Sequence, residues 1–369
     1  MQPLLKILFI ANPNSTHTRR WVNWFIQRGH TAAVIADAPI KNAWEYVQVF
    51  DLPSHFNKRI IRYFVWEIKT RQIIHQWQPD ILHAHRVSSA GWLGAFSNFH
   101  PLVITPWGTD LYQHPAKSSI ARFLAGFTLQ RADLVTADSR DLCSLAIHFG
   151  ANPSITHLIQ LGVDTGIFNP SETTGEWNNL FGITGRPVVL SPRGVNRIYN
   201  LDTIIRAISL IKPAFPGIIM ILREYNVDPS YKAELERLIQ QHGLQNTVCW
   251  IGEIEPYSNL ADLYRLSDVV VSVPSSDGTP VSVLEAMACG APVIASDLPS
   301  LREWISHREN GLLVPARDHI TLASQITEIL LNPGLRVLFA SRNFILIKEK
   351  GTQDKEMSKM ELLYRGLVN

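Results

Sequence analysis

The sequence has 369 residues, of which 46% are hydrophobic and 18% charged, and its formal net charge at pH 7 is only +2. This length exceeds one ordinary core and is typical of two domains. The balanced charge excludes a global field that would recruit nucleic acid, and no apolar stretch approaches the roughly 18 residues of a membrane span.

Three cysteines are widely spaced, at Cys143, Cys249 and Cys289, and form no CxxC or metal-ligand pattern. An odd number without such spacing predicts reduced thiols in a cytoplasmic protein. The apolar run at residues 4–10 is short and interrupted by Lys6, so it predicts a buried first strand rather than a signal peptide.

Short apolar runs alternate with helical patterns in the first half of the chain, which predicts parallel strands joined by crossover helices. The first strand is expected at 7–11, followed by a polar loop that contains Ser15, Thr16 and His17. Further strands are expected at 31–36, 81–85, 102–105 and 132–137, with a long helix at 58–76.

A break in composition near residue 161 predicts an interdomain linker at 166–182, between a first domain at 1–165 and a second at 183–350. Residues 351–369 are expected to form a C-terminal helix that returns toward the first domain. A second alternating series predicts strands at 187–190, 218–222, 248–251, 269–273 and 292–295, with helices at 201–212, 230–242 and 321–332.

These two series predict an α/β protein with two Rossmann-like domains that face each other across a cleft. Ligands of parallel sheets bind beyond the carboxyl ends of the strands, so we expect the ligand between the two sheets. No GxGxxG follows the first strand, which disfavours a nicotinamide or flavin enzyme. The sequence therefore indicates no cofactor.

The most informative segment is 274–290, which follows a valine-rich strand. Thr279 is suited to be an N-cap, and Pro280 to be the first residue of a helix. The N-terminus of this helix would then lie at the top of the sheet, where its free N–H groups and dipole suit a phosphate. Asp277 in the loop and Glu285 in the helix are expected to border the same cleft.

This segment resembles the family-4 glycosyltransferases of the GT-B fold (glycosyl transferases group 1), whose signature is two acidic residues separated by seven others, as Asp277 and Glu285 are. The alternative to a functional role is that Asp277 is an ordinary turn residue and Glu285 is a solvated position on the helix. The resemblance continues in order along the chain, at an Arg-Gly-His turn (28–30), a strand ending in a histidine (80–85), the linker (161–170), a nucleotide-base strand (248–252) and an Asn-Gly turn (310–314).

The resemblance implies a retaining hexosyl transfer from a nucleoside-diphosphate sugar to a glycan, lipid-linked or small-molecule acceptor, as in polysaccharide biosynthesis. Glu285 would bind the donor ribose, and Asp277 would contact the donor sugar or stabilise the transition state. Arg193 would clamp the diphosphate, and Arg197 could replace the family's lysine. The other donor-binding candidates are Gly252, Gly278, Thr279, Pro280 and Val281.

No Asp-x-Asp or His/Cys cluster occurs, which predicts a metal-independent reaction.

The acceptor side departs from the family pattern, which often has a histidine before Gly-x-Asp. Here that position is Trp107, which cannot accept a proton. Its task would fall to Asp110 or His85, or to no residue. His85 and His17 each follow an expected strand and could reach the cleft, although a lone histidine is more often a hydrogen-bonded structural residue.

Two other functions stay open on the same architecture. A nucleotide-sugar epimerase or hydrolase would need no acceptor. A non-catalytic subunit would bind the nucleotide sugar without turning it over. The replacement of the usual first Glu by Asp277 is consistent with this alternative.

The helix at 58–76 suggests a peripheral membrane contact through residues 58–71, on the inner face of the cell membrane. We expect an apolar stripe to face the core, formed by Ile61, Phe64, Val65 and Ile68. A basic arc with an outward aromatic would suit anionic headgroups, formed by Lys58, Arg62, Lys69 and, on a neighbouring face, Arg59 with Trp66. The alternative is a solvated basic face with Trp66 packed on another helix.

Overall fold

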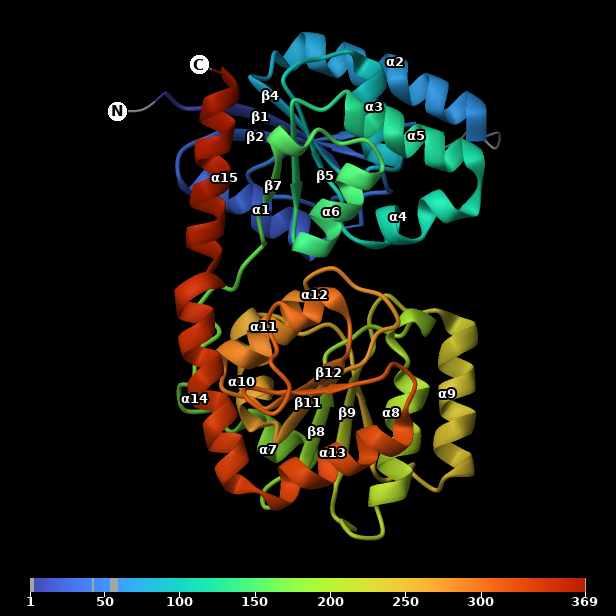
Figure 1. The fold of residues 1–369 in the computed structure, drawn as a ribbon, viewed down its shortest axis with the longest axis vertical. Coiled ribbons are helices and arrows are strands. Elements are labelled where there is room, and N and C mark those ends of the chain that lie inside the picture. Colours follow the sequence, from blue (N-terminus) through green and yellow to red (C-terminus); the bar gives the residue numbers. More distant parts are fainter. Residues whose placement is uncertain (1–2, 42, 54–58, 369) are drawn as a thin grey trace. The chain divides into compact units, whose positions relative to one another are not determined.

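The structure, a computed structural model, describes residues 3–41, 43–53 and 59–368. The chain divides into two compact units (Figure 1), the first formed by Met1–Leu161 with Glu356–Asn369 and the second by Gly162–Lys355. Each unit is a parallel sheet with helices on both faces, as the alternating pattern predicted.

The first sheet has the strand order β3-β2-β1-β4-β5-β6-β7, and all of its pairs are parallel. Its strands are β1 (Lys6–Ala11), β2 (Thr31–Ala36), β3 (Gln48–Asp51), β4 (Ile81–His85), β5 (Leu102–Thr105), β6 (Leu134–Ala137) and β7 (Thr156–Leu158). The order reverses between β1 and β4, so the carboxyl ends of these two strands form the switch point where ligands of such sheets bind.

Helices cover both faces of the first sheet. They are α1 (Thr16–Gln27), α2 (Arg59–Trp77), α3 (Ser89–Ser97), α4 (Thr109–Tyr112), η1 (His114–Lys117), α5 (Ser119–Gln130), α6 (Arg140–His148), η2 (Pro153–Ile155) and α15 (Gln353–Val368). One core cluster joins the sheet to α2, α3, α5 and α6. On the other face, Trp21 and Phe25 of α1 and Tyr364 of α15 contact the sheet or each other.

The orientation of α2 differs from the sequence prediction. Trp66 is buried and donates a hydrogen bond from Nε1 to the Pro53 carbonyl at 2.8 Å. The apolar stripe expected in the core is instead exposed at Ile61, Phe64 and Ile68. Trp66 shares its buried face with Thr70, Ile73 and Ile74, which follow it at helical spacing along α2. Lys58 lies outside the described residues.

The C-terminal helix α15 belongs to the first unit from Glu356 onward. Tyr364 Oη lies 2.5 Å from His83 Nδ1 of β4, and Glu361 accepts a hydrogen bond from Arg28 Nε at 3.0 Å. The C-terminal helix therefore completes the core of the first unit with residues far from it in the sequence. Among the described helices, none is long and apolar enough to cross a membrane.

The second sheet has the order β10-β9-β8-β11-β12-β13, again parallel. Its strands are β8 (Val188–Ser191), β9 (Ile219–Arg223), β10 (Val248–Ile251), β11 (Val269–Ser272), β12 (Val293–Ser296) and β13 (Leu312–Val314). The switch point lies between β8 and β11. The strands predicted at 31–36, 81–85, 102–105 and 248–251 are confirmed at both ends.

Two core clusters pack on opposite faces of this sheet, one with α8, α9 and α13 and the other with α10 and α11 (Figure 1). The helices of this unit are α7 (Glu176–Phe181), η3 (Arg197–Tyr199), α8 (Leu201–Ile211), α9 (Pro229–Gln241), α10 (Tyr257–Leu266), α11 (Val281–Ala288), α12 (Pro299–Arg302), α13 (His319–Leu331) and α14 (Pro333–Lys350).

The segment 166–182, expected to be a linker, is part of the second unit. Phe168 is fully buried and packs edge-on against Tyr264 of α10, and α7 also lies in this segment. Burial of so large a side chain ties the segment to the core. The chain passes from the first unit to the second at Leu161 and Gly162.

Candidate functional site

The switch point of the second sheet brings Arg193 and Asp277 together. Arg193 follows β8 and Asp277 follows β11, the two strands between which the order reverses. Arg193 Nη2 donates to Asp277 Oδ2 at 2.7 Å, and Nη1 donates to Ser282 Oγ of α11 at 3.2 Å. The Arg193 guanidinium also stacks over the Tyr199 ring, 4.2 Å from its centroid. Residues 84 positions apart in sequence thus form one polar cluster.

This cluster is largely buried, with side-chain exposures of 9% for Arg193 and 19% for Asp277. Burial raises the pKa of the Asp277 carboxyl, and the charge of Arg193 together with the Gly278 N–H opposes that rise. Burial by itself would lower the pKa of Arg193, but Asp277 raises it, so the guanidinium keeps its charge. Its Nε atom is buried without a hydrogen-bond partner among the described residues. A buried cationic donor with an unused N–H suits an anionic ligand.

Helix α11 begins one residue later than predicted. Pro280 has φ −75° and ψ 103°, which is extended rather than helical, so it occupies the N-cap position and Val281 is the first helical residue. Thr279 is therefore not the N-cap. In the first turn of α11, the Val283 N–H donates to the Pro280 carbonyl at 2.9 Å, and the Ser282 hydroxyl accepts a hydrogen bond from Arg193. The partial positive end of the helix thus lies beside the guanidinium.

Glu285 lies on α11 and is 5% exposed. Tyr264 of α10 donates its hydroxyl to Glu285 Oε2 at 3.3 Å. Burial raises the pKa of Tyr264 well above its usual value, so this phenol stays protonated and remains a donor. Glu285 is therefore a held, buried carboxylate rather than a solvated position on a helix surface.

Two donor candidates lie apart from this cluster. Arg197 is half exposed and makes a two-pronged ion pair with Glu234 of α9, at 2.8 and 2.5 Å. Because that carboxylate engages both terminal nitrogens, Arg197 does not join Arg193. Gly252 follows β10 at the edge of the sheet, exposed and with open space where a side chain would project.

In the first unit, His85 ends β4 at the switch point and is 2% exposed. Its ring lies 5.0 Å from that of Trp107, which in turn lies 5.0 Å from His17. Burial, then the charges of Arg86 and His17, lower the pKa of His85 to about 3. His85 is therefore neutral near pH 7, and its Nε2 has no hydrogen-bond partner among the described residues.

Asp110 fastens two loops together. Its Oδ2 accepts the Val87 N–H at 2.7 Å and its Oδ1 accepts the Trp107 N–H at 2.9 Å. Burial raises the pKa of Asp110, and these hydrogen bonds and the charge of Arg86 oppose the rise. Both oxygens are thus used to hold backbone, which favours a positioning role over the catalytic role that the sequence suggested.

Arg86, directly after His85, is a candidate functional residue that was not predicted from the sequence. Its φ is +95°, a left-handed conformation that is strained for a residue with a side chain. The loop held by Asp110 maintains it, and the partly exposed guanidinium makes no hydrogen bond to another described residue. Because Arg86 is a cation with a strained backbone at the switch point, it is a candidate functional residue. The only sequence signal for it is its position directly after the histidine that ends a strand.

The polar loop expected at residues 15–17 is largely helical, because α1 begins at Thr16 with Ser15 as its N-cap. Thr16 is exposed and His17 is partly buried beside Trp107. Within the residues that the structure describes, no three His, Cys, Asp or Glu side chains gather with metal-binding geometry.

Two protein-family models match the chain in succession. The model described as "Glycosyl transferase 4-like" matches residues 6–139, and the model "Glycosyl transferases group 1" matches residues 176–343. The second match includes Arg193, Asp277 and Glu285.

Among curated relatives, the chain is 27% identical over 258 residues to a D-inositol 3-phosphate glycosyltransferase of Jonesia denitrificans, which covers 65% of this chain. The chain spans 60% of the length of that relative and 66% of a second one, from Xylanimonas cellulosilytica. It is also 24% identical to the lipopolysaccharide core biosynthesis mannosyltransferase LpcC of Rhizobium leguminosarum bv. viciae, covering 82% of this chain and 84% of the relative.

Solved structures share the fold over nearly the whole chain. Anabaena HepE in complex with UDP-glucose superposes with a TM-score of 0.85 at 21% identity, covering 98% of this chain and all of the other. Sucrose-phosphate synthase from Thermosynechococcus elongatus gives a TM-score of 0.84 at 20% identity, covering 98% and 99%.

Proposed function

Because the chain belongs to the group 1 glycosyltransferases of the GT-B type, we propose that it transfers a sugar from a nucleoside-diphosphate donor to an acceptor hydroxyl. The observation that carries this proposal is the ion pair of the buried Arg193 with the partly buried Asp277 at the switch point, beside the N-terminus of α11. A permanent cation and a helix terminus in one place suit a diphosphate, and the neighbouring carboxylates suit sugar hydroxyls.

Arg193 is the residue that we assign to the diphosphate. Its Nη atoms are engaged by Asp277 and Ser282, while the buried Nε is left for a phosphate oxygen. As the bond from the sugar to the diphosphate breaks, negative charge grows on the leaving phosphate. A cation fixed by stacking on Tyr199 stabilises that charge without having to reorient.

In this proposal, Asp277 contacts the donor sugar and Glu285 binds the ribose. Asp277 is held by Arg193 and lies in the loop before α11, so it can approach the hexose or the positive charge that develops at the anomeric carbon. Glu285 is fixed by Tyr264 and would accept hydrogen bonds from the ribose hydroxyls. The anomeric configuration would be retained, and no metal would be needed.

On the acceptor side, His85 and Arg86 are the groups that we assign. His85 is neutral, so its unpaired Nε2 can exchange a hydrogen bond with an acceptor hydroxyl. Arg86 would favour an acceptor that carries a negative group. The second candidate function, hydrolysis or epimerisation of the donor, uses the same donor contacts and differs only in needing no acceptor.

A screen of nucleoside-diphosphate sugars by thermal stabilisation tests the proposal, because a ligand that binds only the native state raises the melting temperature. UDP-glucose is the first probe, since HepE was solved with it. Stabilisation by one donor, followed by a glycosylated product only when acceptor is present, supports transfer. Free sugar or an epimer formed without acceptor would assign the second candidate function, and no stabilisation by any donor would refute both.

A further inference from the structure

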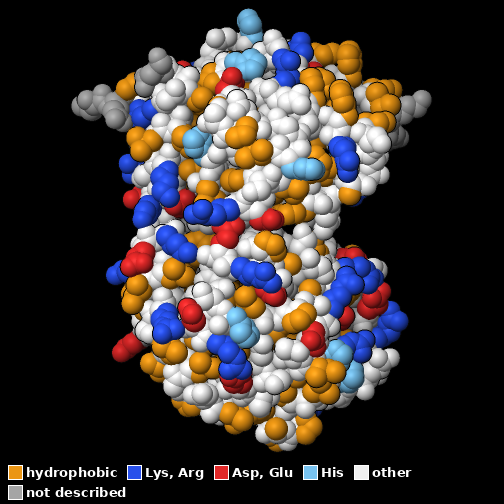
Figure 2. All heavy atoms as spheres, in the orientation of Figure 1, with side chains coloured by type: hydrophobic (Ala, Val, Ile, Leu, Met, Phe, Trp, Pro, Cys, Tyr) orange, Lys and Arg blue, Asp and Glu red, His pale blue; other side chains and the backbone are white. Residues whose placement is uncertain are grey.

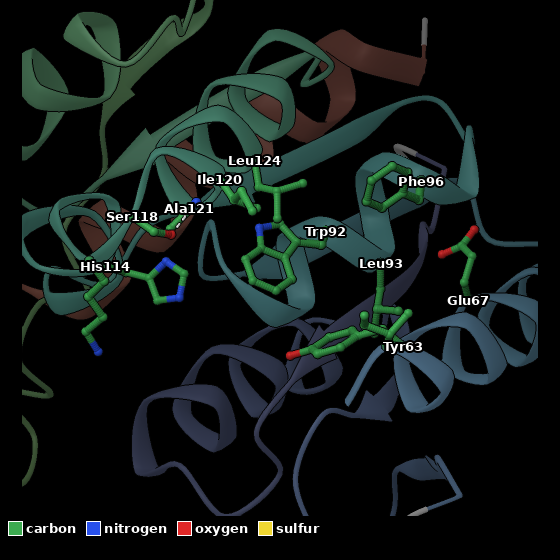
Figure 3. A pocket seen from close by; sticks show the side chains of 12 residues that line it. Tyr63, Glu67, Trp92, Leu93, Phe96, His114, Ser118, Ile120, Ala121 and Leu124 are labelled. Carbon is green, nitrogen blue, oxygen red and sulfur yellow. Dashed lines mark hydrogen bonds between the residues drawn. The ribbon is translucent and has the colours of Figure 1, made fainter. Parts of the chain in front are cut away.

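An apolar groove of about 450 Å³ opens on the first unit between α2, α3 and α5 (Figure 3). Trp92 and Leu93 of α3 form its floor, Tyr63 lies on the α2 side, and Ile120 and Leu124 lie on the α5 side. Among the described residues that line it, the ionisable side chains are Tyr63, Glu67, His114 and Lys117. None of the residues assigned above to donor or acceptor lines this groove.

Large apolar side chains around the groove stand out into solvent. Ile60 is 86% exposed and Ile120 is 72% exposed, and both line the groove. Phe64 and Phe123 are 67% and 69% exposed, and Phe123 is linked to the groove through a stack in which Phe127 lies 4.9 Å from Phe96. Figure 2 shows orange side chains gathered over the end of this unit where Figure 1 places α2 and α5. Contiguous apolar exposure of this kind marks an interaction surface.

The charge around the groove is almost entirely positive. Glu67 is the only acidic residue in α2, α3, η1 and α5, and Arg71 occupies it in an ion pair at 2.7 Å. Lys69, Lys117 and Arg122 are exposed on the same helices. The surface therefore combines protruding apolar side chains with unneutralised cations.

We propose that this groove face, formed by α2, α3, η1 and α5, docks on a lipid bilayer that contains anionic headgroups. The protruding side chains would enter the acyl boundary while Lys117 and Arg122 meet the headgroups. A small apolar ligand in the groove would leave Phe64 and Phe123, which do not line it, exposed. A second copy in a two-fold dimer would place this cationic face against itself, which like charges oppose.

The face differs from the one that the sequence suggested, because Trp66 is buried and the apolar side chains of α2 face outward instead. Membrane docking does not depend on the proposed sugar transfer. A lipid-linked acceptor would explain why the protein docks on a membrane. Its test therefore uses neither donor nor acceptor, so that failure of one proposal leaves the other standing.

The test is co-sedimentation of the full chain with phosphatidylcholine vesicles, with and without phosphatidylglycerol, at low and high salt. We expect binding to the anionic vesicles at low salt, about tenfold weaker without the anionic lipid or at high salt. The triple variant Phe64→Ser, Ile120→Ser, Phe123→Ser should lower the partition coefficient by about tenfold or more.

The matched control removes three equally exposed apolar side chains from the second unit, Leu180→Ser, Leu331→Ser and Val337→Ser, which are 67 to 69% exposed. It should bind vesicles as the wild type does. In the bound wild type, amides in the first half of α2 and in α5 should exchange more slowly with solvent. The proposal would be overturned by no binding at low salt, by equal binding to both kinds of vesicle, or by unchanged binding of the triple variant at Phe64, Ile120 and Phe123. It would also be overturned by a dimer in solution that this triple variant abolishes and the control variant does not.

Discussion

Arg193 and Asp277 bind each other across the point where the strand order of the second sheet reverses, with 2.7 Å between Nη2 and Oδ2. Arg193 is buried, Asp277 is partly buried, and each neutralises the other, while the Arg193 Nε has no hydrogen-bond partner among the described residues. In the proposed complex, the diphosphate therefore shares Arg193 with Asp277. Because of this sharing, a substitution at Asp277 or Arg193 should change ligand binding and turnover to different extents.

Asp277→Asn and Glu285→Gln should each lower kcat by about a hundredfold or more, because in the proposed complex both carboxylates position the donor, Asp277 at the sugar and Glu285 at the ribose. Asp277→Asn should keep or strengthen binding of the nucleoside diphosphate, since Arg193 loses its competing anion. Steady-state kinetics and calorimetric titration measure the two effects. Near-normal turnover in both folded variants would remove them from the site.

Arg193→Lys should weaken nucleoside-diphosphate binding by about tenfold or more, because a single ammonium cannot reproduce the fork of N–H donors. Arg197→Ala is the control, since that side chain is paired with Glu234 on the surface. It should bind the ligand as the wild type does. Equal losses in the two variants would mean that both arginines contact the diphosphate.

Chelation by EDTA should leave the transfer rate unchanged, and added magnesium or manganese should not increase it. In the proposed complex, Arg193, which contacts Ser282 at the start of α11, would supply with that helix end the positive charge that the leaving phosphate needs. Activity lost in EDTA and restored by either ion would contradict this prediction.

Acidification should destabilise the first unit through His85. Its folded pKa is about 3, against about 6.5 in an unfolded chain, so between these values only the unfolded state carries the proton. Stability is therefore lost as the pH falls below about 6.5, by at most about 1.4 kcal/mol per pH unit for this group. His85→Asn should make the slope of unfolding free energy against pH shallower, as measured by urea denaturation. An unchanged slope would show that His85 titrates normally.

Much of the fold followed from local pattern. The strands at 31–36 and 248–251 were predicted to the residue, because a buried parallel strand is a short apolar run bounded by polar turns. The spacing of Asp277 and Glu285 around a helix start likewise needed only adjacent sequence. The prediction placed that start one residue early, since Pro280 can adopt either cap or helix geometry.

Other features depended on which surfaces meet. The sequence of α2 carries two apolar stripes, and only packing against the sheet decided that Trp66 is buried while Phe64 is exposed. The pairing of Arg197 with Glu234, on a different helix, likewise could not be predicted from local sequence, and the role of Arg197 toward the diphosphate stays a prediction.

The sequence by itself determined two α/β halves and an acidic pair at a helix start, because strand and helix periodicities and short motifs are local. The tertiary structure decided that Asp110 holds the loops after β4 and β5, that Arg86 adopts a strained backbone there, and that Tyr364 of the last helix meets His83. These contacts join residues up to 281 positions apart. No local pattern encodes such pairs, because they form only when separate elements are packed together.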